Sequence, residues 1–312
     1  MDFGKNKKSV FLKLLFSIIF CAFLFYFLSE KLNFNQNEWL NTLKRFDEGS
    51  VAVTVVLALL QVWFQNTRLW FLYSHLEKTT WVTGARAFSY GQVFNNFLPA
   101  RMGEVVKVLT LSKGSENASK LRATVAVILE KFADFLAISV LALFVLPKLL
   151  NRIDLDQKKI LSIFAVLFLF IVLAKVFYEK ISKKLMNLKD TFQFLKNKNI
   201  FFISLFLGFG VWISEAGMIY ILCRQLGFHL LSSEVLWVMI VVNLGIMVPL
   251  TIANIGTFEA AMAFALSGVG VMKIEALSVA IIHHAIQVGA VIIWAAMLFL
   301  FSYRKSARLK SE

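Results

Sequence analysis

Cysteine, proline and acidic side chains are all scarce in this sequence. It has two cysteines, Cys21 and Cys223, which are too few for a framework of disulfides. Its three prolines and 59% hydrophobic composition leave long apolar runs uninterrupted, whereas soluble domains are about 45–50% apolar. Several of these runs approach the roughly 20 residues that cross a bilayer as a helix. The sequence therefore predicts an all-α polytopic membrane protein.

The shortage of acidic residues gives the chain a strong positive charge. There are 19 acidic residues against 33 lysines and arginines, for a formal net charge of +14. Nucleic-acid binding would be one explanation, but the basic residues fall between the apolar runs, as expected from the enrichment of Lys and Arg in cytoplasmic loops. We therefore expect no nucleic-acid partner.

Motifs for nucleotide-driven or enzymatic chemistry are also missing. The sequence has no Gly-x4-Gly-Lys-Ser/Thr phosphate loop, so direct drive by ATP is not expected. It has no nucleophile elbow and no cluster of His, Cys and Asp at metal-ligand spacing. We expect no metal, no cofactor and no enzymatic activity.

The apolar runs predict six full transmembrane helices. The first, which follows a basic N-terminus, is long for the core of a signal peptide and lacks a small-residue cleavage site, so we expect it to be retained. Residues 181–198 form a basic amphipathic segment that suits the surface of the cytoplasmic leaflet. Lysine and arginine concentrate in segments that lie on one side if both termini are cytoplasmic. The expected helices are 10–28, 51–73, 123–146, 160–177, 200–222 and 276–301.

Two further segments are too short to span and are broken by polar residues. Residues 87–98 and 103–111 flank a break at Pro99, and residues 234–248 and 257–269 flank a break at 249–256. Lipid tolerates non-helical backbone only where protein or water covers it. We therefore expect two re-entrant hairpins. Their polar residues follow the same order and are Asn95, Asn96, Arg101, Gly103 and Glu104 in the first, and Asn243, Asn254, Gly256 and Glu259 in the second.

The unit of span, broken hairpin and span thus occurs twice, in opposite orientations. Inverted repeats with discontinuous helices are typical of transporter folds, in which the substrate binds between the repeats. The predicted organisation is one integral membrane domain, 1–312. Its parts are the first helix and outer loop (1–50), repeat 1 (51–147), a linker (148–199), repeat 2 (200–302) and a basic cytoplasmic tail (303–312).

Charged residues within the first repeat are candidates for binding, because a carboxylate at a helix centre costs about 2.5–3.5 kcal/mol on insertion scales. Glu130 and Asp134 share one helix face and should either bind a cationic group or relay protons, or else form structural ion pairs with Arg68, Lys131 or Arg101. Arg68 itself shares a helix face with Gln61.

The first break combines Arg101 with a helix expected to begin near Gly103. A helix N-terminus presents free N–H groups and suits a phosphate, as does arginine. The alternative is that Arg101 extends to the membrane interface. Glu104 in the first turn can cap its own helix or pair with Arg101 or Lys107.

The second repeat supplies the counterpart of this site. Gly256 allows a backbone break, and Asn254 and Glu259 flank it. His283 and His284 lie in the last span on different faces. At most one is expected to titrate in a cavity, and hydrogen bonding between helices is the alternative.

Three stretches of this sequence resemble the lysylphosphatidylglycerol synthase transmembrane-domain family, whose members are also called flippase-like proteins. They are residues 96–104, Asn-Phe-Leu-Pro-Ala-Arg-Met-Gly-Glu; residues 127–134, Val-Ile-Leu-Glu-Lys-Phe-Ala-Asp; and Pro249 followed by residues 254–259, Asn-Ile-Gly-Thr-Phe-Glu. The resemblance implies a protein of the bacterial inner membrane that is linked to the movement of a polar-headed lipid between leaflets. Bifunctional members also carry a soluble transferase domain, which we do not expect here.

Three functions remain as hypotheses. The first is a lipid translocase whose substrate has an anionic or phosphate-containing head group. The second is an ion-coupled transporter of a small solute. The third is a scaffold for an enzyme of envelope synthesis, which would not need Glu130 and Asp134 within a span.

The topology is open to a direct test. Cysteines introduced at Lys5 and Arg308 should react with a membrane-impermeant thiol reagent only from the cytoplasm, and those at Asn37 and Asp154 only from outside. Labelling of the positions 5 and 308 from opposite sides would contradict the six-span prediction.

Overall fold

The computed structural model describes residues 35–97, 102–114, 119–150, 197–246 and 251–308, and these residues form helices and connections without a strand. The predicted all-helical class is thus confirmed for this part of the chain. Two predicted spans, 10–28 and 160–177, the segment 181–196, and Pro99, Arg101 and Pro249 lie outside the described residues. The helices are α2 (Gln36–Leu43), α3 (Glu48–Ser74), α4 (Trp81–Phe97), α5 (Gly103–Lys113), α6 (Lys120–Leu150), α9 (Lys198–Gln225), α10 (Ser232–Gly245), α11 (Thr257–Gly268) and α12 (Lys273–Arg308), with a short 3₁₀ helix, η4 (Ile252–Asn254).

Three of these helices are long and apolar enough to cross a membrane: α3, α9 and the part of α12 up to Leu300. They correspond to the spans predicted at 51–73, 200–222 and 276–301. The 31 residues of α6 would also reach across a bilayer, but its middle carries Glu130, Lys131 and Asp134. This helix continues to Leu150, past Pro147, near which the sequence predicted its end. The chain is a helical membrane protein.

The helices begin where the sequence offers a capping side chain. The Asn35 side chain accepts hydrogen bonds from the amides of Asn37 and Glu38 at the start of α2. Asp47 accepts from the Ser50 amide at 2.9 Å at the start of α3, and this hydrogen bond holds the pKa of Asp47 below its usual value. Each cap satisfies amides that have no partner within the helix.

The first hairpin consists of α4 and α5. Its first arm begins at Trp81, earlier than the predicted residue 87, because contacts from other helices hold the first turn. The Trp81 ring packs edge-on against Trp294 of α12 at 6.4 Å, and its Nε1 donates to Thr67 Oγ1 of α3 at 3.3 Å. The sequence Trp81-Val82-Thr83-Gly84 does not by itself indicate a helix, because these contacts come from residues distant in the chain.

Two glycines let the arms of this hairpin pack closely. Gly103, the first residue of α5, is buried, and a Cβ atom on it would lie 1.8 Å from the carbonyl oxygen of Gly91 on α4. A Cβ on Gly91 would lie 2.3 Å from Lys107 Cγ. The helix start predicted near Gly103 is confirmed, and the absence of a side chain there serves the packing of α4 against α5.

The second hairpin, α10 and α11, is joined by a strained connection. Ala253, Asn254 and Gly256 all have positive φ, at 51°, 58° and 83°. Glycine adopts such a conformation without steric cost, whereas alanine and asparagine do so less readily. The Gly256 amide donates to Glu259 Oε2 at 2.6 Å and so caps α11. The predicted second arm, 257–269, is confirmed by α11.

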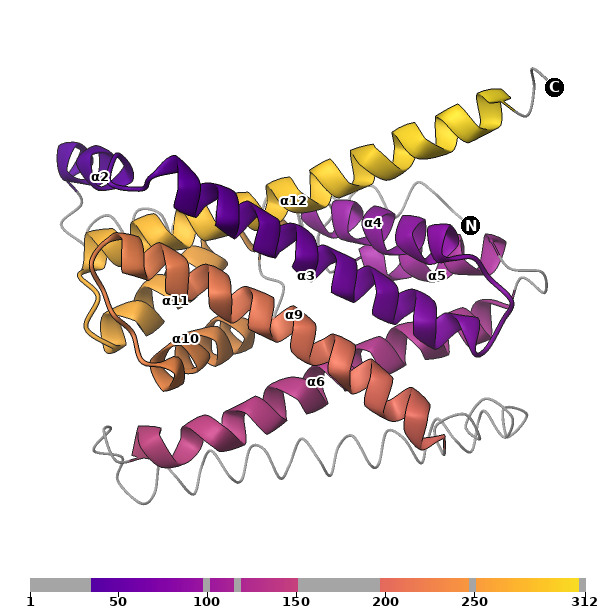
Figure 1. Ribbon diagram of the computed structural model, residues 1–312, viewed down its shortest axis with the longest axis horizontal. Helices are drawn as coiled ribbons and strands as arrows, with labels where there is room; N and C mark the ends of the chain where they lie inside the picture. The colour runs from indigo at the N-terminus through magenta and orange to yellow at the C-terminus, as the bar shows by residue number, and fades with distance from the viewer. Residues whose placement is uncertain (1–34, 98–101, 115–118, 151–196, 247–250, 309–312) are drawn as a thin grey trace, which may run out of the picture.

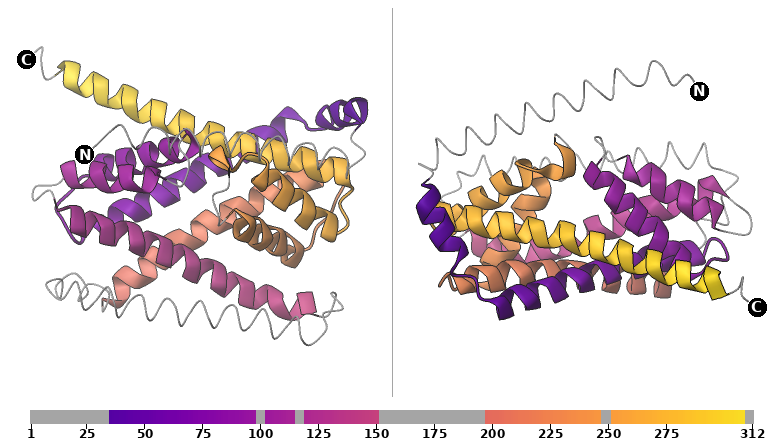
Figure 2. Two further views of the ribbon diagram at one scale, coloured as in Figure 1. Left: turned by 180° about the vertical axis from the view of Figure 1, so that it is seen from behind. Right: turned by 90° about the horizontal axis from the view of Figure 1, so that it is seen from above.

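The two hairpins lie at opposite ends of the molecule, and α3 and α9 pack along each other between them (Figure 1). Each hairpin also contacts the last helix of the other half, since α4 packs on α12 and α10 packs on α6. The same arrangement is visible from behind and from above (Figure 2). Apolar side chains form one core around α10 and α11 and another around α3, α4 and α5.

The stability of the fold should depend on the close contact between Gly91 and Gly103. We expect Gly103→Ala to destabilise the protein by about 3 kcal/mol or more, at the upper end of overpacking effects, because the added methyl group meets backbone. Gly289→Ala is the matched control, since a Cβ on Gly289 of α12 would meet nothing within 4 Å. Thermal unfolding of the detergent-purified variants measures both. Equal melting temperatures would contradict the close packing.

Candidate functional site

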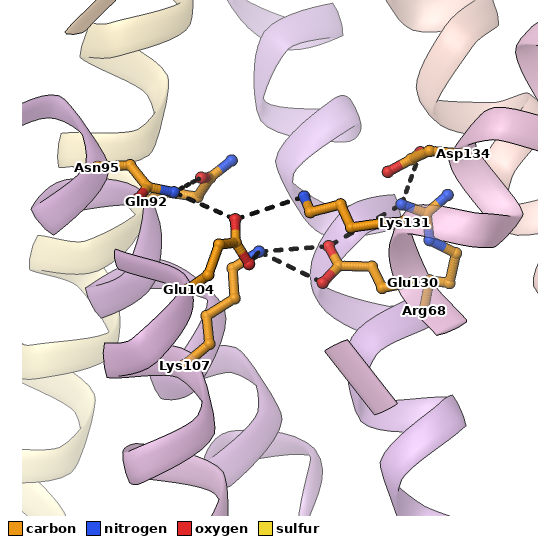
Figure 3. A network of polar contacts seen from close by, with 8 residues as sticks. All are labelled: Arg68, Gln92, Asn95, Glu104, Lys107, Glu130, Lys131 and Asp134. Carbon is orange, nitrogen blue, oxygen red and sulfur yellow. Dashed lines mark hydrogen bonds and ion pairs between the residues drawn. The ribbon is translucent and has the colours of Figure 1, made fainter. Parts of the chain in front are cut away.

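Six charged side chains gather where the first hairpin meets α3 and α6 (Figure 3). We call them the ion-pair network. Three are cations and three are carboxylates, so the network has no formal net charge. Its members are Arg68 on α3, Glu104 and Lys107 on α5, and Glu130, Lys131 and Asp134 on α6.

The inner part of the network is removed from solvent. The side chains of Arg68 and Lys107 are 0% exposed, and that of Glu130 is 1% exposed. Lys107 Nζ lies 3.4 Å from Glu130 Oε1 and 3.3 Å from Oε2, and the ammonium also lies over the Phe88 ring at 4.9 Å. Arg68 Nη2 lies 4.0 Å from Glu130 Oε1. Pairing of this kind is what allows charges to remain in a low-dielectric interior.

The outer part of the network is accessible. The side chains of Lys131, Glu104 and Asp134 are 45%, 25% and 21% exposed. Lys131 Nζ lies 3.5 Å from Glu104 Oε1, and Asn95 donates to the same oxygen at 3.3 Å. Asp134 Oδ1 lies 2.8 Å from Arg68 Nη2. A ligand can therefore meet one cation and two carboxylates at this surface.

Arg68 keeps unused hydrogen-bonding capacity. Its Nε and Nη1 atoms have no hydrogen-bond partner among the described residues, although the side chain is fully buried. Buried donors without a partner are rare in native proteins. Nη1 also lies close to α9, because a Cβ on Gly208 would be 3.2 Å from it. The Nη1 donor is therefore covered by the backbone of α9 at Gly208.

A second polar cluster lies nearer the N-terminal end of α3. Glu215 of α9 is buried and accepts hydrogen bonds from Gln61 of α3 and Asn243 of α10, each at 3.0 Å. Gln287 of α12 donates to Gln61 at 3.4 Å. Gln61 and Arg68 are two helical turns apart, so α3 carries polar groups toward both hairpins on one face.

The third polar contact belongs to the second hairpin. His284 Nδ1 of α12 lies 2.7 Å from Glu259 Oε1 of α11, so the hydrogen bond between helices that we gave as an alternative is present for His284. His283 is fully buried and stacks on Phe258 with ring centroids 5.5 Å apart. Neither of its ring nitrogens forms a hydrogen bond among the described residues, although the Glu215 backbone lies near the ring.

The structure brings together some of the candidate residues and separates others. Arg68, Glu104, Glu130 and Asp134 belong to the ion-pair network, and Asn95 donates a hydrogen bond to Glu104. Asn243 and Glu259 lie in the two clusters near the second hairpin. Gly103 packs on Gly91, and Asn254 helps to form the break. Asn96 is partly buried on α4.

The sequence analysis gave too little weight to two residues of these polar clusters, Lys107 and Glu215. Lys107 was considered only as a partner of Glu104, and its i, i+3 spacing from Glu104 was the available signal. Glu215 was visible as a lone carboxylate in an apolar span. Its neighbours Gln61 and Gln287, however, come from distant parts of the chain.

The buried pair Lys107–Glu130 should be strongly coupled. We expect Lys107→Met and Glu130→Gln each to destabilise the protein by about 3 kcal/mol, the low end of the cost of breaking a buried ion pair. Each removes one partner of a buried charge and leaves another, since Lys107 also contacts Glu104 and Glu130 also faces Arg68. The double variant should lose clearly less than the sum of the two. Thermal or denaturant unfolding in detergent measures the four free energies of this double-mutant cycle. Lys113→Met, at the exposed end of α5, is the control. Additive losses would show that the two side chains do not depend on each other.

Comparison with known proteins gives one match. The family described as the lysylphosphatidylglycerol synthase TM region matches residues 10–295, which is nearly the whole chain. No curated protein and no solved structure matches the chain. The match covers both hairpins, the ion-pair network, α3, α9 and the part of α12 up to residue 295. The chain therefore belongs to the family of the lysylphosphatidylglycerol synthase TM region.

Proposed function

We propose that this protein is a lipid translocase, which moves a lipid with a phosphate-containing head group between the leaflets of the bacterial inner membrane. The observation that carries the proposal is the ion-pair network, whose inner part is buried and whose outer part is accessible. The family provides independent support, because the name of its TM region refers to the synthesis of an aminoacylated phospholipid. Charged groups within membrane helices are costly and mark sites of function by default.

The outer part of the network suits a polar head group. Lys131 can receive a phosphate, and the partly exposed carboxylates of Glu104 and Asp134 can receive a cationic part of the same head group. Arg101, predicted from the sequence as a further phosphate contact, lies outside the described residues. The acyl chains would stay in the bilayer while the head group follows the polar side chains.

A path for the head group is suggested by the order of the polar clusters. The ion-pair network, the Gln61–Glu215–Asn243 cluster and the Glu259–His284 pair follow one another from the first hairpin to the second. Arg68 has two buried donors that are free to receive a phosphate once α3 and α9 separate. The head group would exchange one set of charge partners for the next.

Reciprocal packing of the two halves supports the inverted repeat, while six spans with both termini cytoplasmic remain predictions from the sequence. Within each half, two packed arms of a hairpin lie between two long helices: α4 and α5 between α3 and α6, and α10 and α11 between α9 and α12. Each first arm packs on the last helix of the other half. Rocking of one repeat against the other around a central site is the mechanism of many secondary transporters. An ion-coupled carrier of a small solute would use the same architecture.

The proposal is tested by a leaflet-specific assay in reconstituted vesicles that contain a fluorescent phospholipid. We expect Lys131→Gln and Asp134→Asn each to lower the initial transport rate about tenfold, which corresponds to about 1.4 kcal/mol of barrier. Lys113→Gln, an exposed position at the end of α5, should leave the rate unchanged. Rates are expressed per correctly folded molecule.

Three results would contradict the proposal. A wild-type protein that moves no phospholipid but accumulates a water-soluble solute in an ion gradient would favour the solute carrier. Wild-type rates for both network variants would remove the network from the path. A protein that binds an enzyme of envelope synthesis and transports nothing would favour the scaffold.

A further inference from the structure

Both carboxylate oxygens of Glu259 make a close polar contact. Oε1 lies 2.7 Å from His284 Nδ1 on α12, and Oε2 accepts from the Gly256 amide at the start of α11 at 2.6 Å. The side chains are only 10% and 14% exposed for His284 and Glu259. Glu259 therefore holds the break of the second hairpin with one oxygen and binds α11 to α12 with the other.

The same contact exists in the first half of the chain, with lysine in place of histidine. Glu104 lies in the first turn of α5, and Glu259 lies in the first turn of α11. Their partners sit at matching positions of the next helix: Lys131 is eleven residues after Lys120, where α6 begins, and His284 is eleven residues after Lys273, where α12 begins. Lys131 Nζ contacts Glu104 Oε1 as His284 Nδ1 contacts Glu259 Oε1.

The two contacts differ in chemistry. An ammonium group such as that of Lys131 stays charged at neutral pH, whereas imidazole is the side chain whose charge changes between about pH 5 and 8. One half of the molecule thus has a permanent ion pair, and the other has a pair whose charge depends on a proton. With a protonated imidazole, α11 and α12 are joined by a hydrogen bond whose donor and acceptor are both charged, whereas with a neutral ring only the acceptor is charged and the bond is weaker.

Several helices bring ionisable side chains to the neighbourhood of His284. Glu259 faces it from α11, and His283 adjoins it on α12. One turn further along α12, Gln287 donates to Gln61 of α3, which in turn donates to the carboxylate of Glu215 on α9. The ionisable side chains of α4, which packs on α12 through Trp81, are Arg86 and Tyr90. The α2 end of α12 holds its own pair, Arg45–Glu275 at 3.3 Å.

We propose that the Glu259–His284 pair is a proton-binding site, and that release of its proton loosens α11 from α12. The imidazole takes one proton from water at Nε2 while its Nδ1–H stays on Glu259 Oε1, so the charge of the site rises by one. Loss of that proton leaves a neutral ring beside the carboxylate and replaces the ion pair by a weaker hydrogen bond. In a transporter, which is the function proposed above, this step would couple the second hairpin to a proton gradient.

The site itself is tested without any transport measurement. The protein, labelled at its four histidines, is titrated in detergent by NMR of the imidazole resonances. We expect one histidine signal, lost in His284→Gln, whose titration midpoint Glu259→Gln lowers by about 1–3 pH units, the usual effect of removing a close opposite charge. His229→Lys, a substitution of an exposed histidine in the loop between α9 and α10, should leave that midpoint unchanged. A His284 signal that does not titrate between pH 5 and 9, or a midpoint that Glu259→Gln does not move, would overturn the proposal.

A second variant covers the case in which Glu259→Gln fails to fold. His284→Lys recreates the permanent pair of the first half, so its thermal stability should vary less with pH than that of the wild type between about pH 5 and 8. An unchanged pH dependence would count against the site.

The transport assay then separates this inference from the proposed function. If the wild type moves lipid at a pH-dependent rate and His284→Lys removes that dependence, the proton site and the coupling are both supported. If the rate is independent of pH, the coupling is wrong while the translocase stands. If nothing is transported but the imidazole titrates as expected, the translocase fails and the proton site stands on the NMR result.

Discussion

The buried contact of Lys107 and Arg68 with Glu130 is the interaction on which the rest of the first half depends. Lys107 and Glu130 come from α5 and α6, and Arg68 comes from α3, so three helices meet at one set of charges. Each charge would be very costly alone in a low-dielectric interior, and each is tolerated because the others are there. The helices cannot move independently unless these partners are exchanged. The network therefore holds three helices together, and a charged ligand that replaced one of its ion pairs would loosen that contact.

The broken helices solve a related problem for the backbone. Polar peptide groups at a break within a membrane protein need a partner or a cover. In the second hairpin Glu259 supplies the partner for the Gly256 amide, and in the first hairpin close contact between Gly91 and Gly103 supplies the cover. Each of these contacts holds the start of the second arm, α5 or α11, in place.

The two halves share an arrangement and differ in charge. Each places a carboxylate in the first turn of the second hairpin arm and a basic side chain in the middle of the following helix. The first half adds Arg68, Lys107, Glu130 and Asp134, which makes a network of permanent charges. The second half surrounds its pair with neutral amides, the buried Glu215 and an aromatic ring, Phe258, that packs on both histidines. A small number of residues thus makes the two halves electrostatically different, which is the basis of the proton-binding site proposed for the second half.

The sequence determined the helical class, the breaks in both hairpins and the helix starts near Gly103 and Thr257, because apolar run length and local break residues are properties of the chain itself. It also marked Glu130 and Asp134 as unusual and named Arg68 and Lys131 among their possible partners, since a charge within a span needs one. It did not determine that Lys107 is the main partner of Glu130, that Gln61 and Asn243 hold Glu215, or that Glu259 binds His284 rather than His283. Those contacts join residues on separate helices, and only the tertiary packing decides which side chains meet.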